Sequence, residues 1–385
     1  MNWETQNLGT VIRLKRGYDL PSSDRIHGEI PIVSSSGITG YHNVEKIAGP
    51  GVVTGRYGTI GEIHYIEGSY WPLNTSLYVE DFKGNHPRFI SYLLRTIELK
   101  SQNVAGAVPG VNRNALHQIK VRIPDFDTQC RIATILATYD DLIDANTRRM
   151  TLLENAARCL YREWFVNLRF PGYESTKFPN KVPSNWEKLP ISDLIEINPR
   201  TEYEKGIERP FVDMAALSET SMIIGPRTLR VISGGAKFKN GDTLFARITP
   251  CAENGKTGFV QFLEDEGAVA SGSTEFIVLR SARVNPWWVY CTARENNFRE
   301  HAIRSMGGSD GRQRVNTKCF SQFFTLLPPQ MVLDQFKTEV ADWFVQVEQL
   351  CEQNRCLSRA RDLLLPKLVR GDIDVSGNAE QKIII

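Results

Sequence analysis

The sequence predicts an α+β protein in which two mixed α/β globular units alternate with two long helices that form an antiparallel coiled coil. Residues 129–164 contain neither Gly nor Pro and place apolar or core-compatible side chains in 4-3-4-3 steps, the spacing of a coiled-coil seam. The same register returns 204 residues later, where Phe336 takes the place of Ile132. Each helix follows a region whose composition is typical of short strands and turns. The chain is therefore predicted to be an internal pseudo-twofold repeat.

Each long helix has a seam with one central Asn. The first seam comprises Ile132, Leu136, Tyr139, Ile143, Asn146, Met150, Leu153, Ala157, Leu160 and Trp164, and the second comprises Phe336, Val340, Trp343, Val347, Leu350, Asn354, Leu357, Arg361, Leu364 and Leu368. Arg361 is the one clear misfit in this pattern. We expect Pro366 to end or bend the second helix before Leu368, because proline has no backbone N–H to donate.

An antiparallel register in which paired residue numbers sum to 500 places compatible side chains opposite each other. Asn146 then faces Asn354, and Tyr139 faces Arg361. A buried Asn pair can specify register at some cost in stability. At about 1.5 Å per residue, such a helix pair is roughly 50 Å long, and we expect it to hold the two globular units at opposite ends.

The length of 385 residues exceeds one ordinary core and predicts two or more domains. The expected parts are a first unit in residues 1–125, a long helix in 126–167, a linker and second unit in 168–328, a second long helix in 329–372 and a tail in 373–385. Within the first unit we expect short strands over 30–80, a helix over 86–100 that begins at Pro87, a Gly-rich loop over 105–112 and a strand over 116–124. The second unit reopens with Asn185-Trp186-Glu187, as the first opens with Asn2-Trp3-Glu4, and residues 241–260 are the counterpart of 49–66.

The composition is that of an ordinary globular protein, with 41% hydrophobic and 23% charged residues. The formal charge of +2 neither demands nor excludes nucleic acid, because a basic strip can hide in a balanced total. The seven cysteines form no CxxC pair, and the chain opens without a secretion signal, so we expect reduced thiols, a cytoplasmic location and no structural zinc. No apolar run approaches 18 residues, so no membrane-spanning segment is predicted.

The sequence offers no catalytic constellation. Asn198-Pro199 lacks the second proline and the aromatic residue with which an amino-methyltransferase holds its target amine, and no phosphate-binding loop is present. The six histidines do not have metal-ligand spacing. Asp140, Asp141 and Asp144 are predicted to form a solvated or partner-facing helix surface rather than a metal or acid–base cluster. These features favour a recognition role over an enzymatic one.

Several stretches resemble the specificity (S) subunit of type I restriction-modification systems. They are the Asn-Trp-Glu opening of each unit, the run over residues 109–165, and the ending SRARDLLLPKLVRGDI over residues 358–373. The likeness covers almost the whole chain and is strongest in residues 108–170 and 310–375. It implies a non-catalytic subunit in which each unit is a target-recognition domain that reads one half of a split double-stranded DNA sequence.

The resemblance also implies partners. The helices would fix the distance between the half-sites and would dock two methyltransferase (M) subunits, while the complete enzyme adds two restriction (R) subunits. From the helix length of roughly 50 Å, we expect half-sites around one DNA turn or slightly more apart. Methylation of adenine N6 would use S-adenosylmethionine in the M subunits, and ATP and Mg²⁺ would bind in partner subunits. No cofactor is expected in this chain. Two aromatic pairs, Trp164 with Phe165 and Trp343 with Phe344, are most simply core residues. One member of each pair could instead contact an M subunit.

Candidate DNA-contacting residues are those whose side chains suit base edges or phosphates. They are Arg56, Tyr57, Thr59, Asn112 and Arg113 in the first half, and Arg247, Thr249, Lys256, Arg312, Gln313, Arg314 and Lys318 in the second. Residues 56–59 could equally be a plain hairpin turn, and Asn112 and Asn316 could be helix caps; for Arg312 and Arg314 we favour DNA. The polar loops 34–36 and 271–273, and Lys46, are further phosphate candidates that could instead be turns and a solvated lysine.

Two competing hypotheses come from other functional classes. A self-contained DNA methyltransferase or nuclease would bind its cofactor in the isolated chain, which the missing motifs argue against. A coiled-coil scaffold without a DNA role would leave no sequence-dependent footprint once its partner subunits were added.

Overall fold

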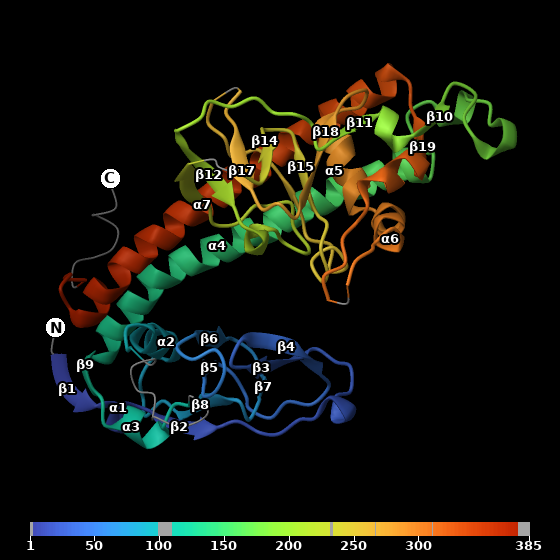
Figure 1. Cartoon of the computed structure of the whole chain (residues 1–385). Helices are drawn as coiled ribbons and strands as arrows, with labels where there is room; N and C mark the ends of the chain where they lie inside the picture. The colour runs from blue at the N-terminus through green and yellow to red at the C-terminus, as the bar shows by residue number, and fades with distance from the viewer. Residues whose placement is uncertain (1–2, 99–109, 232–233, 266, 310, 376–385) are drawn as a thin grey trace. The chain divides into compact units, whose positions relative to one another are not determined.

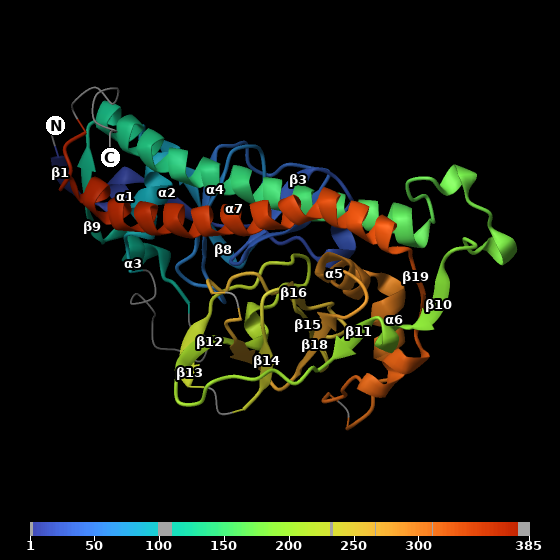
Figure 2. The same ribbon diagram turned by 90° about the horizontal axis from the view of Figure 1, so that it is seen from above.

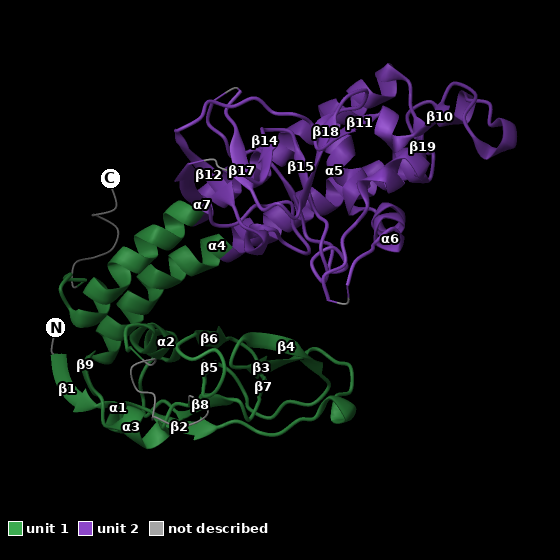
Figure 3. Cartoon of the chain, viewed as in Figure 1, with its two compact units in different colours: residues 1–143, 355–385 green, residues 144–354 purple. Residues whose placement is uncertain are grey.

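The computed structural model describes residues 3–98, 110–231, 234–265, 267–309 and 311–375. The chain divides into two compact units (Figure 3): unit 1 consists of residues 1–143 and 355–385, and unit 2 of residues 144–354. Each unit therefore contains a β-rich portion and part of both long helices. The predicted α+β class is confirmed.

The two long helices are α4 (Phe126–Tyr161), which a π-helical turn over Arg162–Val166 extends, and α7 (Gln330–Arg370). They lie side by side in both views (Figures 1 and 2). In unit 2, the amide nitrogen of Asn146 donates to the amide oxygen of Asn354 at 2.9 Å, and Arg149 donates to Gln346 at 3.0 Å. Because residue numbers rise along one helix as they fall along the other, the pair is antiparallel, as the fold class predicts.

The side-chain partner of Arg361 differs from the one expected. Its guanidinium donates to Asp140 at 2.6 Å, so its partner in unit 1 is a carboxylate and not Tyr139. The two side chains are 22% and 16% exposed. A charged residue is tolerated in the seam because the opposite helix supplies a counter-charge.

Pro366 does not end α7, which continues to Arg370. The turn that contains it is held by packing, because Leu365, Leu368 and Val369 are all buried in the core of unit 1. The helix ends at Gly371, whose φ of 79° is accessible to glycine at little cost. Apolar burial thus offsets the missing hydrogen bond of the proline.

Replacing both members of the Asn pair should stabilise the helix pair. Asn146 is 7% exposed, and a polar seam residue specifies register at a cost in stability. The double variant Asn146→Leu/Asn354→Leu is therefore expected to raise the free energy of unfolding by about 1 kcal/mol, because both polar groups leave together. Chemical denaturation of the full chain measures this. Asn155→Leu, at an exposed position of α4, is the control and should change stability by less than about 0.5 kcal/mol. A clearly destabilised double variant would contradict the expectation.

The β-rich portion of unit 1 contains two sheets and a two-stranded ribbon. The ribbon pairs β1 (Trp3–Asn7) with β9 (Lys120–Pro124). The four-stranded sheet has the order β2 (Arg13–Arg16), β8 (Ser76–Asp81), β5 (Gly51–Gly55), β6 (Ile63–Ile66). The three-stranded sheet has the order β4 (Gly37–His42), β3 (Ile30–Ser34), β7 (Trp71–Pro72), with β3 and β7 parallel.

Unit 2 repeats this topology with one additional strand, β14. Its ribbon pairs β10 (Glu187–Pro190) with β19 (Phe324–Leu327). One sheet has the order β11 (Ile195–Ile197), β18 (Phe276–Ser281), β15 (Thr243–Ala246), β16 (Thr257–Phe259). The other has the order β13 (Thr228–Val231), β12 (Glu208–Val212), β17 (Ala270–Gly272), β14 (Ala236–Phe238), with β12 and β17 parallel. The shared strand orders show that the internal repeat extends to the fold.

Short helices complete both units. Unit 1 has α1 (Leu8–Val11), α2 (Pro87–Arg95) and α3 (Arg113–His117), and unit 2 has α5 (Pro286–Arg294) and α6 (Asn296–Arg304). Single 3₁₀ turns lie at Ser22–Asp24, Tyr173–Ser175, Pro179–Lys181, Ile191–Asp193, Met214–Ala216 and Thr317–Gln322. Pro87 and Pro286 both stand in the first turn of their helix, where a missing N–H costs nothing, and the side chains of His86 and Asn285 cap the two helices.

Two local predictions need adjustment. The helix expected over 86–100 ends at Arg95, and the strand expected over 116–124 starts only at Lys120 because Leu116 and His117 belong to α3. Most of the Gly-rich loop expected over 105–112 lies outside the described residues.

Many of the seam residues belong to the cores of the units. In unit 1, Ile132 and Leu136 pack with Leu365 and Leu368 against the β-rich portion. In unit 2, Trp164 and Phe165 pack with Trp186 and Phe336. Phe344 is fully buried, and Trp343 is half-buried against the same core. Among the described residues, no helix is both long and apolar enough to span a membrane.

Candidate functional site

Two of the loops selected from the sequence meet in unit 1. Residues 56–59 follow β5, and residues 110–113 lead into α3. The backbone N–H of Val111 donates to the carbonyl of Arg56 at 3.0 Å, and Tyr57 forms a β-bridge with Gly110. We call these two segments the loop pair of unit 1.

The side chains of this loop pair form a stack. The Arg56 guanidinium lies over the Tyr57 ring, 4.6 Å from its centroid, a favourable cation–π arrangement. The ring in turn lies against Gly110, where a Cβ atom would be 2.5 Å from Tyr57 Cε1. The lack of a side chain at residue 110 is therefore what lets the ring occupy this place. Arg56 makes no ion pair among the described residues.

Unit 2 has the same arrangement at the corresponding place. Residues 247–249 follow β15, and residues 312–315 precede the 3₁₀ turn at Thr317. The N–H of Val315 donates to the carbonyl of Arg247 at 2.8 Å, and Ile248 forms a β-bridge with Arg314. The N–H of Thr249 also donates to the carbonyl of Gln313 at 3.1 Å. We call these segments the loop pair of unit 2.

Backbone hydrogen bonds fix the correspondence between the two loop pairs. The N–H of Arg56 donates to the carbonyl of Thr75, and the N–H of Arg247 donates to the carbonyl of Glu275. Arg56 and Arg247 are thus equivalent, as are Thr75 and Glu275. By the two β-bridges, Gly110 is equivalent to Arg314.

The electrostatics of the two loop pairs differ. In unit 2 the Arg314 guanidinium donates to both carboxylate oxygens of Glu275 at 2.7 to 3.0 Å. These hydrogen bonds, partly opposed by desolvation, hold the pKa of Glu275 below its ordinary value. Arg247 has only a long hydrogen bond, 3.4 Å, from its Nη2 atom to the Val315 carbonyl, and its Nε atom has no partner in the part of the chain that is described.

Arg247 also lines a hollow of about 490 Å³ in unit 2. Arg200 and Lys237 line the same hollow, and the Lys237 ammonium lies 5.5 Å from the centroid of the Tyr203 ring. Among the described residues that line it, none is Asp or Glu. Such a surface attracts an anionic ligand.

The two candidate asparagines are helix caps. The side-chain oxygen of Asn112 accepts from the N–H of Asn114 at 2.8 Å, and that of Asn316 accepts from the N–H of Lys318 at 3.1 Å. Capping satisfies N–H groups that the helix leaves free. In this structure both residues therefore match the alternative to DNA contact, which is that they cap helices.

The other candidates occupy varied positions. Arg113 and Arg312 are exposed within the loop pairs, Lys318 is exposed beside the loop pair of unit 2, and Gln313 and Thr59 are half-buried within the loop pairs. The hydroxyl of Thr249 is buried and has no partner among the described residues. Lys256 lies apart from the direct loop contacts and donates to the carbonyl of Met214 at 3.3 Å.

Sequence reasoning missed the aromatic partners of the lysines. The Lys46 ammonium lies 4.8 Å from the Tyr18 ring centroid and 5.3 Å from that of Trp71, just as Lys237 lies over Tyr203 in unit 2. No spacing in the sequence signals these pairs, because their members are far apart along the chain. The serine loop over 34–36 is a tight turn closed by its own hydroxyl groups.

Of the three acidic residues of α4 that were expected on a solvated or partner-facing surface, Asp141 and Asp144 are exposed, whereas Asp140 is only 16% exposed and is engaged within unit 1. Asp140 accepts hydrogen bonds from Tyr92 at 2.8 Å and Arg95 at 3.2 Å, in addition to Arg361. Asp141 pairs with Arg88. Both carboxylates thus connect α4 to α2 within unit 1. The described residues contain no group of three or more His, Cys, Asp or Glu side chains that could hold a metal ion.

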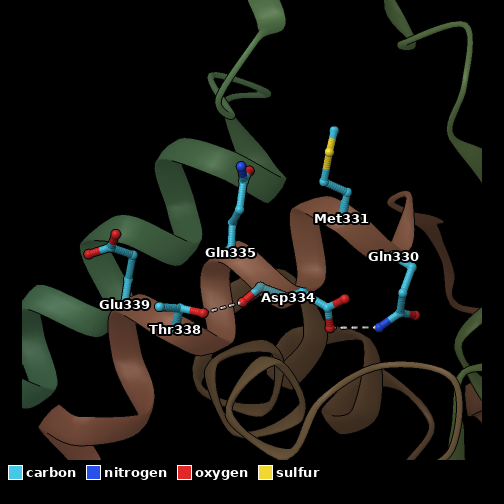
Figure 4. A pocket seen from close by; sticks show the side chains of 6 residues that line it. All are labelled: Gln330, Met331, Asp334, Gln335, Thr338 and Glu339. Atoms are coloured by element: carbon cyan, nitrogen blue, oxygen red, sulfur yellow. Dashed lines mark hydrogen bonds between the residues drawn. The ribbon is translucent and has the colours of Figure 1, made fainter.

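A second candidate surface lies on the first turns of α7 in unit 2 (Figure 4). Its side chains are those of Gln330, Met331, Asp334, Gln335, Thr338 and Glu339. Gln330 donates to the Asp334 carboxylate at 2.9 Å, and Met331 is 67% exposed. An exposed methionine with polar neighbours suits contact with another protein better than chemistry on a substrate.

Comparison with known proteins gives consistent results. A family described as the type I restriction modification DNA specificity domain matches residues 1–155. The MjaIX specificity subunit of Methanocaldococcus jannaschii is 23% identical, over 74% of this chain and 69% of the relative. The HindI specificity subunit of Haemophilus influenzae is 20% identical, over 74% and 77% of the two chains. The EcoEI specificity subunit of Escherichia coli is 28% identical, over 46% of this chain and 30% of the relative.

A solved structure shares the fold. The crystal structure of the S subunit of a type I restriction-modification system from M. genitalium has a TM-score of 0.61, with 12% identity, and the match covers 95% of this chain and 96% of that one.

Proposed function

Because this chain belongs to the specificity-subunit family of type I restriction-modification systems, we propose that each of its units reads one half of a split double-stranded DNA target. The chain is a non-catalytic subunit whose task within the complex is recognition of the DNA target. The loop pair of each unit is the proposed reading site. Residues 1–125 and 168–328 are the proposed recognition domains.

The recurrence of the loop pair carries this proposal. Both units place an Arg at one backbone position, after the equivalent strands β5 and β15, and bring the same second segment against it. Arg is the side chain best suited to bidentate contact with guanine. Around that Arg the side chains differ, with Tyr57 and Gly110 in unit 1 and Glu275 and Arg314 in unit 2. A common frame with different surroundings suits two readers of different half-sites.

The long helices are the proposed spacer. Both α4 and α7 run from one unit into the other, and the hydrogen bond between Asn146 and Asn354 opposes a slip in register. A fixed register would give a fixed gap between half-sites, of around one DNA turn or slightly more.

The exposed faces of these helices are the proposed docking sites for two M subunits. Apolar side chains on them include Leu152, Val345 and Leu363, which are 68%, 50% and 61% exposed, besides Met331. Two R subunits would complete the enzyme, and S-adenosylmethionine, ATP and Mg²⁺ would bind in the partner subunits.

Methylome sequencing of cells that carry the M subunits, with and without this chain, tests the proposed function. We expect one adenine motif split by a non-specific gap to be methylated only in cells that make the chain. An unchanged methylome would contradict the proposal.

Gly110→Ala should weaken recognition of the half-site that unit 1 reads. The added Cβ would meet the Tyr57 ring at 2.5 Å, so the ring and the Arg56 stacked on it must move. Loss of one well-placed base contact corresponds to about 1–3 kcal/mol, or roughly 5- to 150-fold in discrimination. Methylation rates on duplexes altered in one half-site measure this effect.

Gly68→Ala is the matched control for that substitution. A Cβ at residue 68 would meet no atom within 4 Å, and the glycine lies in the same unit. We expect wild-type discrimination from this variant. Equal behaviour of the two variants would contradict the role given to the Tyr57 ring.

A further inference from the structure

We propose that the ion pair of Glu275 and Arg314 is a clamp that closes the loop pair of unit 2, and that Arg247, not Arg314, contacts the base. The inference rests on the proposed function and says which arginine reads the half-site. It reverses the preference for Arg314 that the sequence alone gives.

Arg314 is held by its own unit through both its backbone and its side chain, although the side chain is 44% exposed. Its backbone exchanges two hydrogen bonds with Gly307, at 3.0 and 3.1 Å, and bridges to Ile248. Its guanidinium donates through Nε and Nη2 to both oxygens of Glu275. To contact a base through this fork, Arg314 would have to release Glu275 and leave that carboxylate facing the anionic DNA.

Arg247 has a fixed backbone and a guanidinium that forms no ion pair within 4.0 Å among the described residues, although its charge contributes to lowering the pKa of Glu275. Its N–H donates to the Glu275 carbonyl at 3.0 Å, and its carbonyl accepts from Val315 at 2.8 Å. No carboxylate lies within ion-pair distance of its side chain in the described part of the chain, and its one side-chain hydrogen bond is 3.4 Å long. A preorganised backbone that carries a guanidinium without a carboxylate partner suits a bidentate base contact.

The surroundings of Arg247 suit DNA. Arg200 and Lys237 share its hollow, and the Tyr203 ring beside Lys237 supplies a flat face. The basic side chains can neutralise phosphates while Arg247 reaches a base edge. Arg314 does not line this hollow.

The equivalent residues of unit 1 support these two roles, base contact by Arg247 and loop closure by Arg314. The position equivalent to Arg247 is again an Arg, residue 56, but the positions equivalent to Glu275 and Arg314 are Thr75 and Gly110. There the two loops are packed by the Tyr57 ring on Gly110. The shared arginine is thus the common element, while the means of holding the loops together differs between units.

Exchanging the charges of Glu275 and Arg314 distinguishes a clamp from a base contact. The variants are Arg314→Glu, Glu275→Arg and the double exchange, each assembled with M subunits and tested on duplexes altered in one half-site. We expect each single variant to methylate the cognate duplex about 10-fold more slowly, because like charges then face each other across the loops. The double exchange should recover to within about threefold of wild type with the same base preference. If Arg314 reads the base, the double exchange will stay as defective as Arg314→Glu, or its preference will change.

Arg247→Ala supplies the complementary measurement. It should lower discrimination at one base pair of the unit 2 half-site about 10- to 100-fold and leave the other half-site unaffected. If recognition of the half-site still depends on unit 2 but Arg247→Ala leaves discrimination unchanged, the inference is overturned. If unit 2 reads no DNA, none of these variants will alter either half-site, and the proposed function itself fails.

The exposed pair of Glu300 and Arg304 on α6 is the control for charge exchange. Its side chains are 59% and 78% exposed, and exchanging their charges should alter neither methylation rate nor preference.

Discussion

Glu154→Ala is expected to lower the free energy of unfolding of unit 2 by about 3–5 kcal/mol, the usual cost of removing one partner of a buried ion pair. Glu154 projects from α4 and is 4% exposed. It accepts hydrogen bonds from the N–H of Met222 at 2.8 Å and from the Tyr290 hydroxyl. Its loss would leave buried donors without an acceptor.

Because Arg294 is buried beside Glu154, removing Glu154 should cost more free energy of unfolding than the loss of a single hydrogen bond. It is 5% exposed by side chain, donates to the Tyr290 hydroxyl at 2.8 Å, and reaches the carbonyls of Glu219, Ser221, Gly255 and Thr257. The network joins α4, α5 and two loops of unit 2. Without the carboxylate, the Arg294 charge is left buried with no carboxylate within ion-pair distance among the described residues.

Chemical denaturation of the full chain, with unit 2 followed by hydrogen exchange of α5, measures this loss. Glu163→Ala is the control, because that carboxylate is 45% exposed and pairs only with nearby groups of its own segment. It should cost less than about 1 kcal/mol. A loss below about 1 kcal/mol for Glu154→Ala would show that the network does not stabilise the unit.

Asp140→Ala is expected to destabilise unit 1 by about 3 kcal/mol, at the lower end of the range for buried pairs because the carboxylate is 16% exposed. Asp140 joins three elements, since it binds Tyr92 and Arg95 of α2 and Arg361 of α7. Denaturation followed by hydrogen exchange of α2 reports the effect. Asp144→Ala, at an exposed site on the same helix, should have little effect, and equal losses in the two variants would contradict this account.

The Asp140 carboxylate also makes the stability of unit 1 depend on pH in the acid range. Burial alone would raise the pKa of Asp140, but the hydrogen bonds from Arg361 and Tyr92 and the charge of Arg95 outweigh burial and lower it below the usual value for Asp. A lowered pKa means that the folded state prefers the charged form, so the stabilisation is present above the unfolded-state pKa. It is lost as the pH falls through the folded-state value. Asp140→Asn should therefore flatten the stability profile of unit 1 below about pH 4.

Much of the helix pairing could be predicted from the sequence, because a heptad seam is a local pattern. The 4-3-4-3 spacing determines which face of α4 is buried, and a single Asn in each seam leaves few registers that bring the two together. The partner of Arg361 was harder to predict. Tyr139 and Asp140 are adjacent in sequence, and only the actual geometry of the two helices shows that the carboxylate is the one within reach.

The candidate site could be predicted only in part. The loops containing Arg56 and Gly110 are some 50 residues apart, and their contact depends on how β5 and α3 are placed by the whole of unit 1. Composition identified the arginines as candidates. It could not show that Glu275 holds Arg314 while Arg247 stays available, because that distinction depends on distances of a few ångströms between loops.

Exchange of residues 1–124 for the corresponding part of another specificity subunit, followed by methylome sequencing, tests most directly whether each unit reads one half-site. The hybrid keeps α4, α7 and all of the second recognition domain. We expect a methylated motif in which one half is new, the other half is unchanged and the gap is the same length. A motif changed in both halves, or in neither, would contradict it.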